Sequence, residues 1–139
     1  MKPTIRNLKF YCKHQTEPSL YAKQLRPISI RLTWLLVRTP ISANQATVLQ
    51  GIVGIIGAVL LGYGQFILGA IFLQFGYILD LCDGEVARWK HQESKAGNYL
   101  DLIGHRIVTP AMFFDLGIGT GYIVAGMIAG LFSVKFVRS

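Results

Sequence analysis

Carboxylate side chains gather in one short segment of this 139-residue sequence. Five of the seven acidic residues lie between positions 80 and 101, namely Asp80, Asp83, Glu85, Glu93 and Asp101. Asp80 and Asp83 are three residues apart and therefore share one face of a helix. Asp101 and His105 are four residues apart and share a face of the next helix. Because the connection between these helices is short, the two faces can converge, and we expect three carboxylates and an imidazole around one point.

Such a cluster suits divalent cations, because Mg²⁺ and Mn²⁺ prefer carboxylate oxygens and also bind phosphate. Two cations could hold a pyrophosphate group and stabilise the charge on a leaving phosphate. Carboxylates at the end of a membrane helix are also costly unless they are paired, hydrated or bound to cations. An alternative stays open, in which the same side chains are hydrated acids paired with basic neighbours, namely Arg88, Lys90 and Arg106. Spacing alone gives the two interpretations similar weight.

The segment from residue 80 to residue 105 resembles the signature of the CDP-alcohol phosphatidyltransferase family. That signature reads D-x2-D-G-x2-A-R-x8-G-x3-D-x3-D, and this chain matches every fixed position except the last, where it has His105. The matching residues are Asp80, Asp83, Gly84, Ala87, Arg88, Gly97 and Asp101. Residues 39–47 are similar to the segment that leads into the family's first span, so the resemblance covers roughly residues 27–106. Residues 92–95 most resemble the branch that makes inositol-phosphate-containing lipids.

The resemblance implies a role for each matching residue. Asp80, Asp83 and Asp101 would ligate Mg²⁺ or Mn²⁺, with two ions in the site. The nucleotide and its phosphates would be bound by small and polar positions, namely Asn44, Thr47, Gly84, Ala87, Arg88 and Gly97. Family enzymes displace CMP from a CDP-linked donor, such as CDP-diacylglycerol, with the hydroxyl of a polar alcohol or alcohol phosphate. The implied activity is a phosphotransferase of phospholipid biosynthesis.

His105 stands where the family has an aspartate that ligates metal and acts as general base. Histidine can take both roles, because neutral imidazole ligates metals and its ordinary pKa, close to neutral, suits proton abstraction. It would lower the negative charge of the site by one unit and favour Mn²⁺ or Zn²⁺ over Mg²⁺. Two alternatives to an enzyme stay open: a non-catalytic relative that binds nucleotide or metal, and a small divalent-cation transporter.

The elements that position these residues can be inferred from the charge distribution. Only 15% of the residues are charged, and 52% are hydrophobic. No Lys, Arg, Asp or Glu occurs between Arg38 and Asp80, and a second charge-free run covers Leu116 to Val134. A membrane helix needs about 20 apolar residues, so the first run fits two spans and the second fits one. These runs exclude a soluble globular domain and predict an all-α integral membrane protein with about four spans.

We expect three segments along the chain: a polar arm over residues 1–18, an interfacial amphipathic helix over residues 19–39 and a transmembrane domain over residues 40–139. The spans are expected from about residue 45 to 62, from 66 onward, from 97 onward and from 122 to 136. Gly117, Gly119 and Gly121 predict an external turn between the last two. Because the family usually has six spans, the domain is expected to be short at its C-terminus.

Basic residues are concentrated before the first span. Eight of the 14 occur there, namely Lys2, Arg6, Lys9, Lys13, Lys23, Arg26, Arg31 and Arg38. Such a bias is typical of cytoplasmic segments, which places the site at the cytoplasmic face of the inner membrane. The positive charge would also attract anionic lipid headgroups. We therefore expect membrane lipid as a partner and no nucleic acid.

Four apolar residues recur on one face of the expected interfacial helix: Leu25, Ile28, Leu32 and Leu35. This pattern fits a helix on the inner leaflet or, alternatively, a solvated linker helix. Gly126 and Gly130 form a small-xxx-small pair that fits either packing within the chain or contact in a homodimer. A homodimer is expected, because a partner would close an acceptor cavity that about four spans leave incomplete.

Overall fold

The computed structural model describes residues 7–8 and 20–136, and within these ranges it contains helices and no strand. The long helices are α2 (Leu20–Val37), α3 (Ala43–Gly62), α4 (Phe66–Trp89), α5 (Lys95–Thr120) and α6 (Ile123–Phe136). The prediction of an all-α chain is therefore confirmed for the described residues. The polar arm expected over residues 1–18 lies almost entirely outside them.

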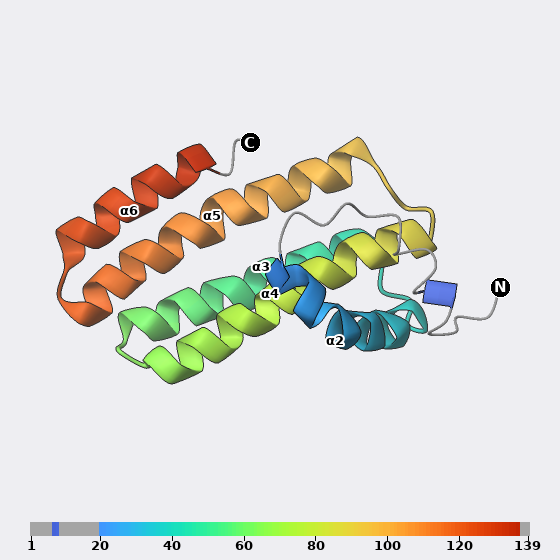
Figure 1. Ribbon diagram of the computed structural model, residues 1–139. Coiled ribbons are helices and arrows are strands. Elements are labelled where there is room, and N and C mark those ends of the chain that lie inside the picture. The colour runs from blue at the N-terminus through green and yellow to red at the C-terminus, as the bar shows by residue number, and fades with distance from the viewer. Residues whose placement is uncertain (1–6, 9–19, 137–139) are drawn as a thin grey trace.

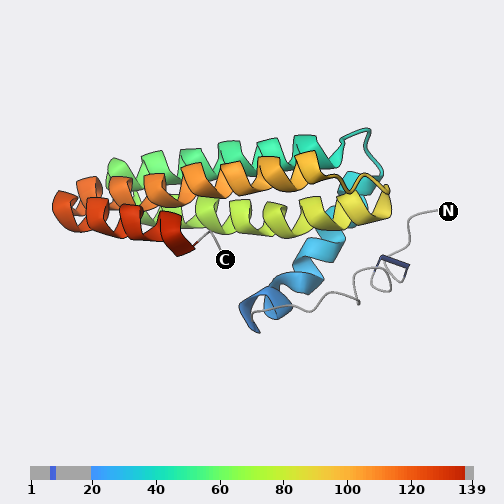
Figure 2. The ribbon, with the colours of Figure 1, turned by 90° about the horizontal axis from the view of Figure 1, so that it is seen from above.

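Three long helices form a bundle. α3, α4 and α5 run alongside one another, and α3 packs against both of the others (Figure 1). α6 folds back along α5, and α2 packs against α4 at an angle to the bundle that is clearest in Figure 2. The end of α4 and the start of α5 therefore lie at the same end of the bundle (Figure 1).

The surface of the bundle is rich in apolar side chains. α3 and α4 are long and apolar enough to cross a membrane, and α6 contains a shorter apolar stretch, Ile123–Val134. Large apolar residues are exposed on several helices, with Ile67 at 80% and Leu131 at 71%. Extensive apolar exposure of this kind is a mark of surfaces that contact lipid or protein. The fold thus agrees with a membrane protein, while the count of four spans stays a prediction.

α2 presents a partly polar face to the rest of the chain. Ser29, Thr33 and Leu36 are buried, whereas Ile28 and Leu35, from the predicted apolar face, are 51% and 55% exposed. Pro27 lies inside this helix. The exposed apolar residues would be free to face lipid, and the interfacial position of α2 stays a prediction.

The starts of α3 and α5 follow from local capping. At α3, the Ser42 hydroxyl accepts a hydrogen bond from the backbone N–H of Gln45, and the Gln45 side chain accepts one from the N–H of Ser42. This reciprocal pair satisfies two backbone donors that the first turn leaves free. α5 starts at Lys95, before the expected position near residue 97, because Ser94 caps it and accepts the N–H of Gly97 at 3.0 Å.

The turn between α5 and α6 is shorter than the glycine pattern predicts. Gly117 and Gly119 lie inside α5, and Gly121, with φ of +79°, ends the helix. A Cβ at Gly117 would lie 2.9 Å from the Cα of Gly126, and one at Gly119 would collide with the carbonyl group of Leu61. The prediction of a turn at Gly117 and Gly119 was therefore wrong, because these glycines serve close helix packing.

The small-xxx-small pair of α6 also faces α5. A Cβ at Gly126 would lie 2.7 Å from the carbonyl oxygen of Phe113, and one at Gly130 would lie 3.1 Å from that of Pro110. The structure therefore assigns Gly126 and Gly130 to packing within the chain, where small residues let two helix backbones approach closely. The homodimer stays a prediction.

Candidate functional site

Three helices carry the ten residues that the sequence analysis identified. α3 supplies Asn44 and Thr47, α4 supplies Asp80, Asp83, Gly84, Ala87 and Arg88, and α5 supplies Gly97, Asp101 and His105. The connection over residues 90–94 joins α4 to α5. It turns the chain back, so that the start of α5 and the end of α4 lie at the same end of the bundle (Figure 1).

A pocket of about 400 Å³ is formed by residues of these three helices and the connection. Eight of the ten predicted residues line it: Asn44, Thr47, Asp83, Gly84, Ala87, Arg88, Gly97 and Asp101. Further polar lining comes from the connection and the start of α5: Gln92, Glu93, Ser94 and Asn98. The pocket therefore combines carboxylates, which can hold divalent cations, with a guanidinium and amides, which can bind a phosphorylated polar ligand.

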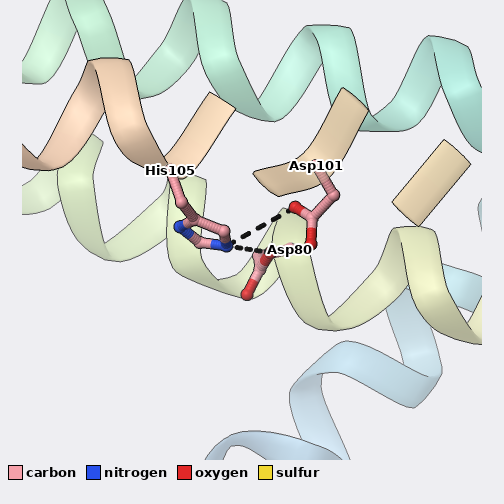
Figure 3. Close-up of side chains that lie close together, drawn as sticks. All are labelled: Asp80, Asp101 and His105. Carbon is pink, nitrogen blue, oxygen red and sulfur yellow. Dashed lines mark hydrogen bonds and ion pairs between the residues drawn. The ribbon is translucent and has the colours of Figure 1, made fainter. Parts of the chain in front are cut away.

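Asp80, Asp101 and His105 form a cluster next to this pocket, with their side chains pointing toward one another (Figure 3). Each offers one ligand atom, and these atoms all lie within 4.8 Å of one another. Nε2 of His105 is 3.0 Å from Oδ1 of Asp80 and 3.4 Å from Oδ1 of Asp101. Oδ1 of Asp101 is buried and accepts no hydrogen bond from the described residues. These ligand atoms, one of which is a buried oxygen that accepts no hydrogen bond, fit a divalent cation.

Asp83 lies outside this cluster but lines the pocket. Its side chain is buried, and the Thr47 hydroxyl lies 2.6 Å from Oδ2 as a hydrogen-bond donor. Asp101 lines the pocket as well and belongs to the cluster, so it connects the two. The structure therefore gathers three of the four predicted metal ligands in one cluster and holds Asp83 apart from it, against Thr47. The expectation of three carboxylates and an imidazole around one point was correct for only two of the carboxylates.

Gln50 is a site residue that the sequence analysis missed. Its Nε2 donates a hydrogen bond to Oδ1 of Asp80 at 3.1 Å, the same oxygen that contacts His105. Gln50 follows Thr47 by three residues, so the two polar side chains project from the same face of α3. A polar pair at this spacing within an otherwise apolar span was the signal that could have revealed it.

The two glycines of the signature lie against polar side chains. A Cβ at Gly97 would lie 3.1 Å from Oδ1 of Asn44 and 3.3 Å from Oγ of Ser94. Gly97 therefore allows α3 and the cap of α5 to approach closely. A Cβ at Gly84 would lie 3.4 Å from the guanidinium nitrogens of Arg88, so the Arg88 side chain folds back along α4 over Gly84.

Side chains of the connection hold it against the start of α3. Oε1 of Gln92 accepts a hydrogen bond from the backbone N–H of Ala43 at 3.1 Å. Lys90 Nζ donates to the carbonyl oxygen of Thr39 at 3.0 Å. The sequence analysis predicted only that the connection is short, whereas three of its residues, Gln92, Glu93 and Ser94, line the pocket.

Two acidic residues lie apart from the site. Glu85 is 3% exposed and hydrogen-bonds Ser29 and Thr33 of α2 rather than facing the pocket. Asp115 lies beside Gly62, at the opposite end of α3 from Asn44 and Thr47. Asp115 therefore lies outside the site. Of the acidic segment over residues 80–101, Glu85 takes no part in the pocket or the cluster.

Comparison with known proteins agrees with this geometry. The sequence model of a family described as CDP-alcohol phosphatidyltransferase matches residues 40–138 of this chain. A protein of Rubrobacter xylanophilus named "Bifunctional IPC transferase and DIPP synthase" is 33% identical over 109 residues, which cover 75% of this chain and 25% of that protein. A protein of the same name from Archaeoglobus fulgidus is 39% identical over 83 residues, or 60% of this chain and 16% of that protein.

A relative with a different name matches a shorter part of the chain. The "Probable cardiolipin synthase (CMP-forming)" of Drosophila melanogaster is 39% identical over 54 residues, which are 38% of this chain and 17% of that protein. The chain therefore spans a quarter or less of the length of these three relatives. All three have names of transferases or synthases.

Proposed function

Because the chain belongs to the CDP-alcohol phosphatidyltransferase family, we propose that it transfers a phosphatidyl or phospho-alcohol group from a CDP-linked donor to an alcohol hydroxyl. The acceptor oxygen bonds to the phosphorus distal to cytidine, the bond between that phosphorus and CMP breaks, and CMP leaves. The product is a phosphodiester. The observation that carries this proposal is the pocket lined by signature residues beside the cluster of Asp80, Asp101 and His105.

Divalent cations, Mg²⁺ or Mn²⁺, would be held by the four predicted ligands. We assign one ion to the cluster of Asp80, Asp101 and His105. We assign a second to Asp83 together with Asp101, since both carboxylates line the pocket. When bound, such ions neutralise the diphosphate and the charge that develops on the leaving phosphate.

The remaining pocket residues would bind the nucleotide. Arg88 is the basic residue of the lining and would contact the phosphates. Asn44 offers an amide from the start of α3, and the short side chain of Ala87 leaves room for the nucleotide. Thr47 keeps its hydroxyl on Asp83, which fixes the orientation of that carboxylate.

His105 is our candidate for the base that takes the proton of the acceptor hydroxyl. Its Nε2 faces the carboxylates of Asp80 and Asp101, whose negative charges would stabilise an imidazolium. The same atom could instead ligate a cation, and it cannot do both in one step. Replacement of His105 therefore separates the two roles.

The choice of donor and acceptor follows from the connection sequence and from the named relatives. We propose CDP-diacylglycerol as the donor and an inositol-phosphate-type alcohol as the acceptor. The similarity of residues 92–95 and the relatives named IPC transferase and DIPP synthase support this choice. The basic N-terminal segment supports an integral membrane protein of the inner membrane, with the site at the cytoplasmic face. A homodimer would complete the acceptor cavity.

Metal removal tests the proposed reaction. Protein purified in detergent is mixed with CDP-diacylglycerol and, in separate samples, inositol phosphate, glycerol phosphate or serine, and released CMP is measured. We expect release with at least one acceptor, loss to background in excess EDTA, and recovery when Mn²⁺ or Mg²⁺ is added beyond the chelator. An absence of CMP release with every acceptor and metal would reject the enzyme in favour of the non-catalytic relative. Metal flux into vesicles that is unchanged by CDP compounds would favour the divalent-cation transporter.

A further inference from the structure

Glu85 is a buried carboxylate of α4 for which the proposed reaction has no direct use. It is 3% exposed, and both of its oxygens are satisfied by hydroxyl groups of α2. The Ser29 hydroxyl donates to Oε1 at 3.0 Å, and the Thr33 hydroxyl donates to Oε2 at 2.6 Å. Ser29 and Thr33 are themselves fully buried and stand four residues apart, on one face of α2. One side chain of α4 is thus held at two points of α2.

The position of Glu85 relative to Asp83 gives this contact its significance. Successive residues of an α-helix are rotated by about 100°, so Asp83 and Glu85 point to nearly opposite sides of α4. Asp83 is held by Thr47 of α3 on the pocket side, and Glu85 is held by α2 on the other side. A rotation of α4 that turned Asp83 away from the pocket would also break the hydrogen bonds of Glu85.

Glu85 is also close in the chain to a residue of the pocket. Arg88 follows Glu85 by three residues, so the two side chains project from one face of α4. Arg88 lines the pocket. The part of α4 that Glu85 holds against α2 therefore also carries the side chain that we assign to the donor phosphates.

Packing alone does not require a carboxylate at this position. The contact between α2 and α4 has its own apolar cluster, which includes Leu36, Cys82 and Val86. An apolar side chain of similar size is often at least as stabilising as a buried charge, because a buried charge loses its hydration. A buried polar contact does, however, select one arrangement of two helices over others, since shifted arrangements leave it unsatisfied.

We propose that Glu85 is a positioning residue, which ties α2 to the C-terminal part of α4 that carries Asp83 and Arg88 and thereby fixes the rotation of that part toward the pocket. The proposal rests on the proposed function, because its main consequence is measured as CMP release. It makes α2 part of the active-site framework in addition to any contact of α2 with lipid.

Substitutions at Glu85 and at its partner Thr33 test this role. Glu85→Leu removes both hydrogen bonds and Thr33→Val removes the one to Oε2, and each keeps a similar side-chain volume. We expect each to lower kcat about 10- to 100-fold, as for small displacements of reacting groups. KM for the donor should rise as kcat falls, because the same part of α4 carries Arg88, which we assign to the donor phosphates. Thr33→Ser keeps the hydroxyl and should retain kcat within about threefold. The double variant Glu85→Leu/Thr33→Val should have about the same kcat as the less active of the two single variants, because both substitutions act on the same contact.

Leu36→Ala is the matched control. It weakens the apolar part of the same helix contact and leaves Glu85, Ser29 and Thr33 in place, so it should lower the unfolding temperature with kcat within about threefold of the wild type. The proposal is overturned if Glu85→Leu retains wild-type kcat, or if Leu36→Ala lowers kcat as much as Glu85→Leu does.

A measurement that needs no turnover separates this proposal from the proposed function. Free Mn²⁺ is followed by electron paramagnetic resonance in titrations of the wild type, Glu85→Leu and Leu36→Ala. If the wild type releases no CMP, the proposed function fails, and the positioning role is decided by Mn²⁺ affinity. At least about tenfold weaker binding in Glu85→Leu than in Leu36→Ala supports the role. Equal affinities overturn it.

Discussion

Asp83→Asn is expected to lower the rate of CMP release about 100- to 1000-fold, the range seen when a group that stabilises transition-state charge is removed. The substitution keeps the shape of the side chain and one oxygen that can accept a hydrogen bond from the Thr47 hydroxyl. In the wild type that hydroxyl lies 2.6 Å from Oδ2. It removes the negative charge that we assign to the second cation. The loss should therefore appear in kcat and in the dependence on Mn²⁺, with little change in folding.

Asp115→Asn is the control for this prediction. It makes the same chemical change at a carboxylate of α5 that lies beside Gly62, away from the pocket. CMP release should stay within about threefold of the wild type, and thermal unfolding should show that both variants are folded. Wild-type turnover in Asp83→Asn would remove Asp83 from the metal site and contradict the assignment of the second ion.

Replacement of His105 should have opposite results according to the side chain introduced. His105→Ala removes the imidazole that contacts Asp80 and Asp101, and we expect CMP release to fall at least about 100-fold, as for the loss of a general base. His105→Asp restores the last position of the family signature and should retain or increase turnover. Because an anionic oxygen replaces a neutral nitrogen, activity with Mg²⁺ should rise relative to activity with Mn²⁺.

Rates measured with each metal separate the two roles of His105. If the imidazole acts mainly as a metal ligand, excess Mn²⁺ should partly restore CMP release by His105→Ala. If it acts mainly as a base, extra metal should have no effect on that variant. Unchanged turnover in His105→Ala would mean that His105 takes no part in the reaction.

Local spacing was sufficient to predict much of the site. Asp80 and Asp83 share a helical face whatever the tertiary structure, and so do Asp101 and His105. A short connection then brings the two faces together, and the structure places Asp80, Asp101 and His105 in one cluster. The signature supplied the rest, since its glycine and arginine positions have no evident role in the sequence until a ligand is considered.

Contacts between distant segments could not be predicted in this way. In the sequence, Glu85 cannot be told apart from the other carboxylates of the acidic segment. In the structure it accepts hydrogen bonds from Ser29 and Thr33, which are 56 and 52 residues away. Gln50 likewise became part of the site only through the packing of α3 against α4. Pairings at such separation depend on how helices dock, which no local pattern contains.

Glycine was ambiguous for a physical reason. It is the residue of choice both for turns that need positive φ and for places where two backbones meet closely. Gly121 has the first role, with φ of +79°, whereas Gly117 has the second, against Gly126 of α6. The two roles look alike in sequence, which is why the end of α5 was predicted too early.

The most direct test of the central claim is the thermal stability of the detergent-purified protein with CDP or CDP-diacylglycerol, each with and without Mn²⁺. A ligand at 100 times its dissociation constant should stabilise the native state by about 2.7 kcal/mol. We predict a rise in the unfolding temperature that requires nucleotide and Mn²⁺ together and is lost in Asp83→Asn but kept in Asp115→Asn. No rise with either CDP compound, or an equal rise in Asp83→Asn, would contradict a metal-dependent nucleotide site in this pocket.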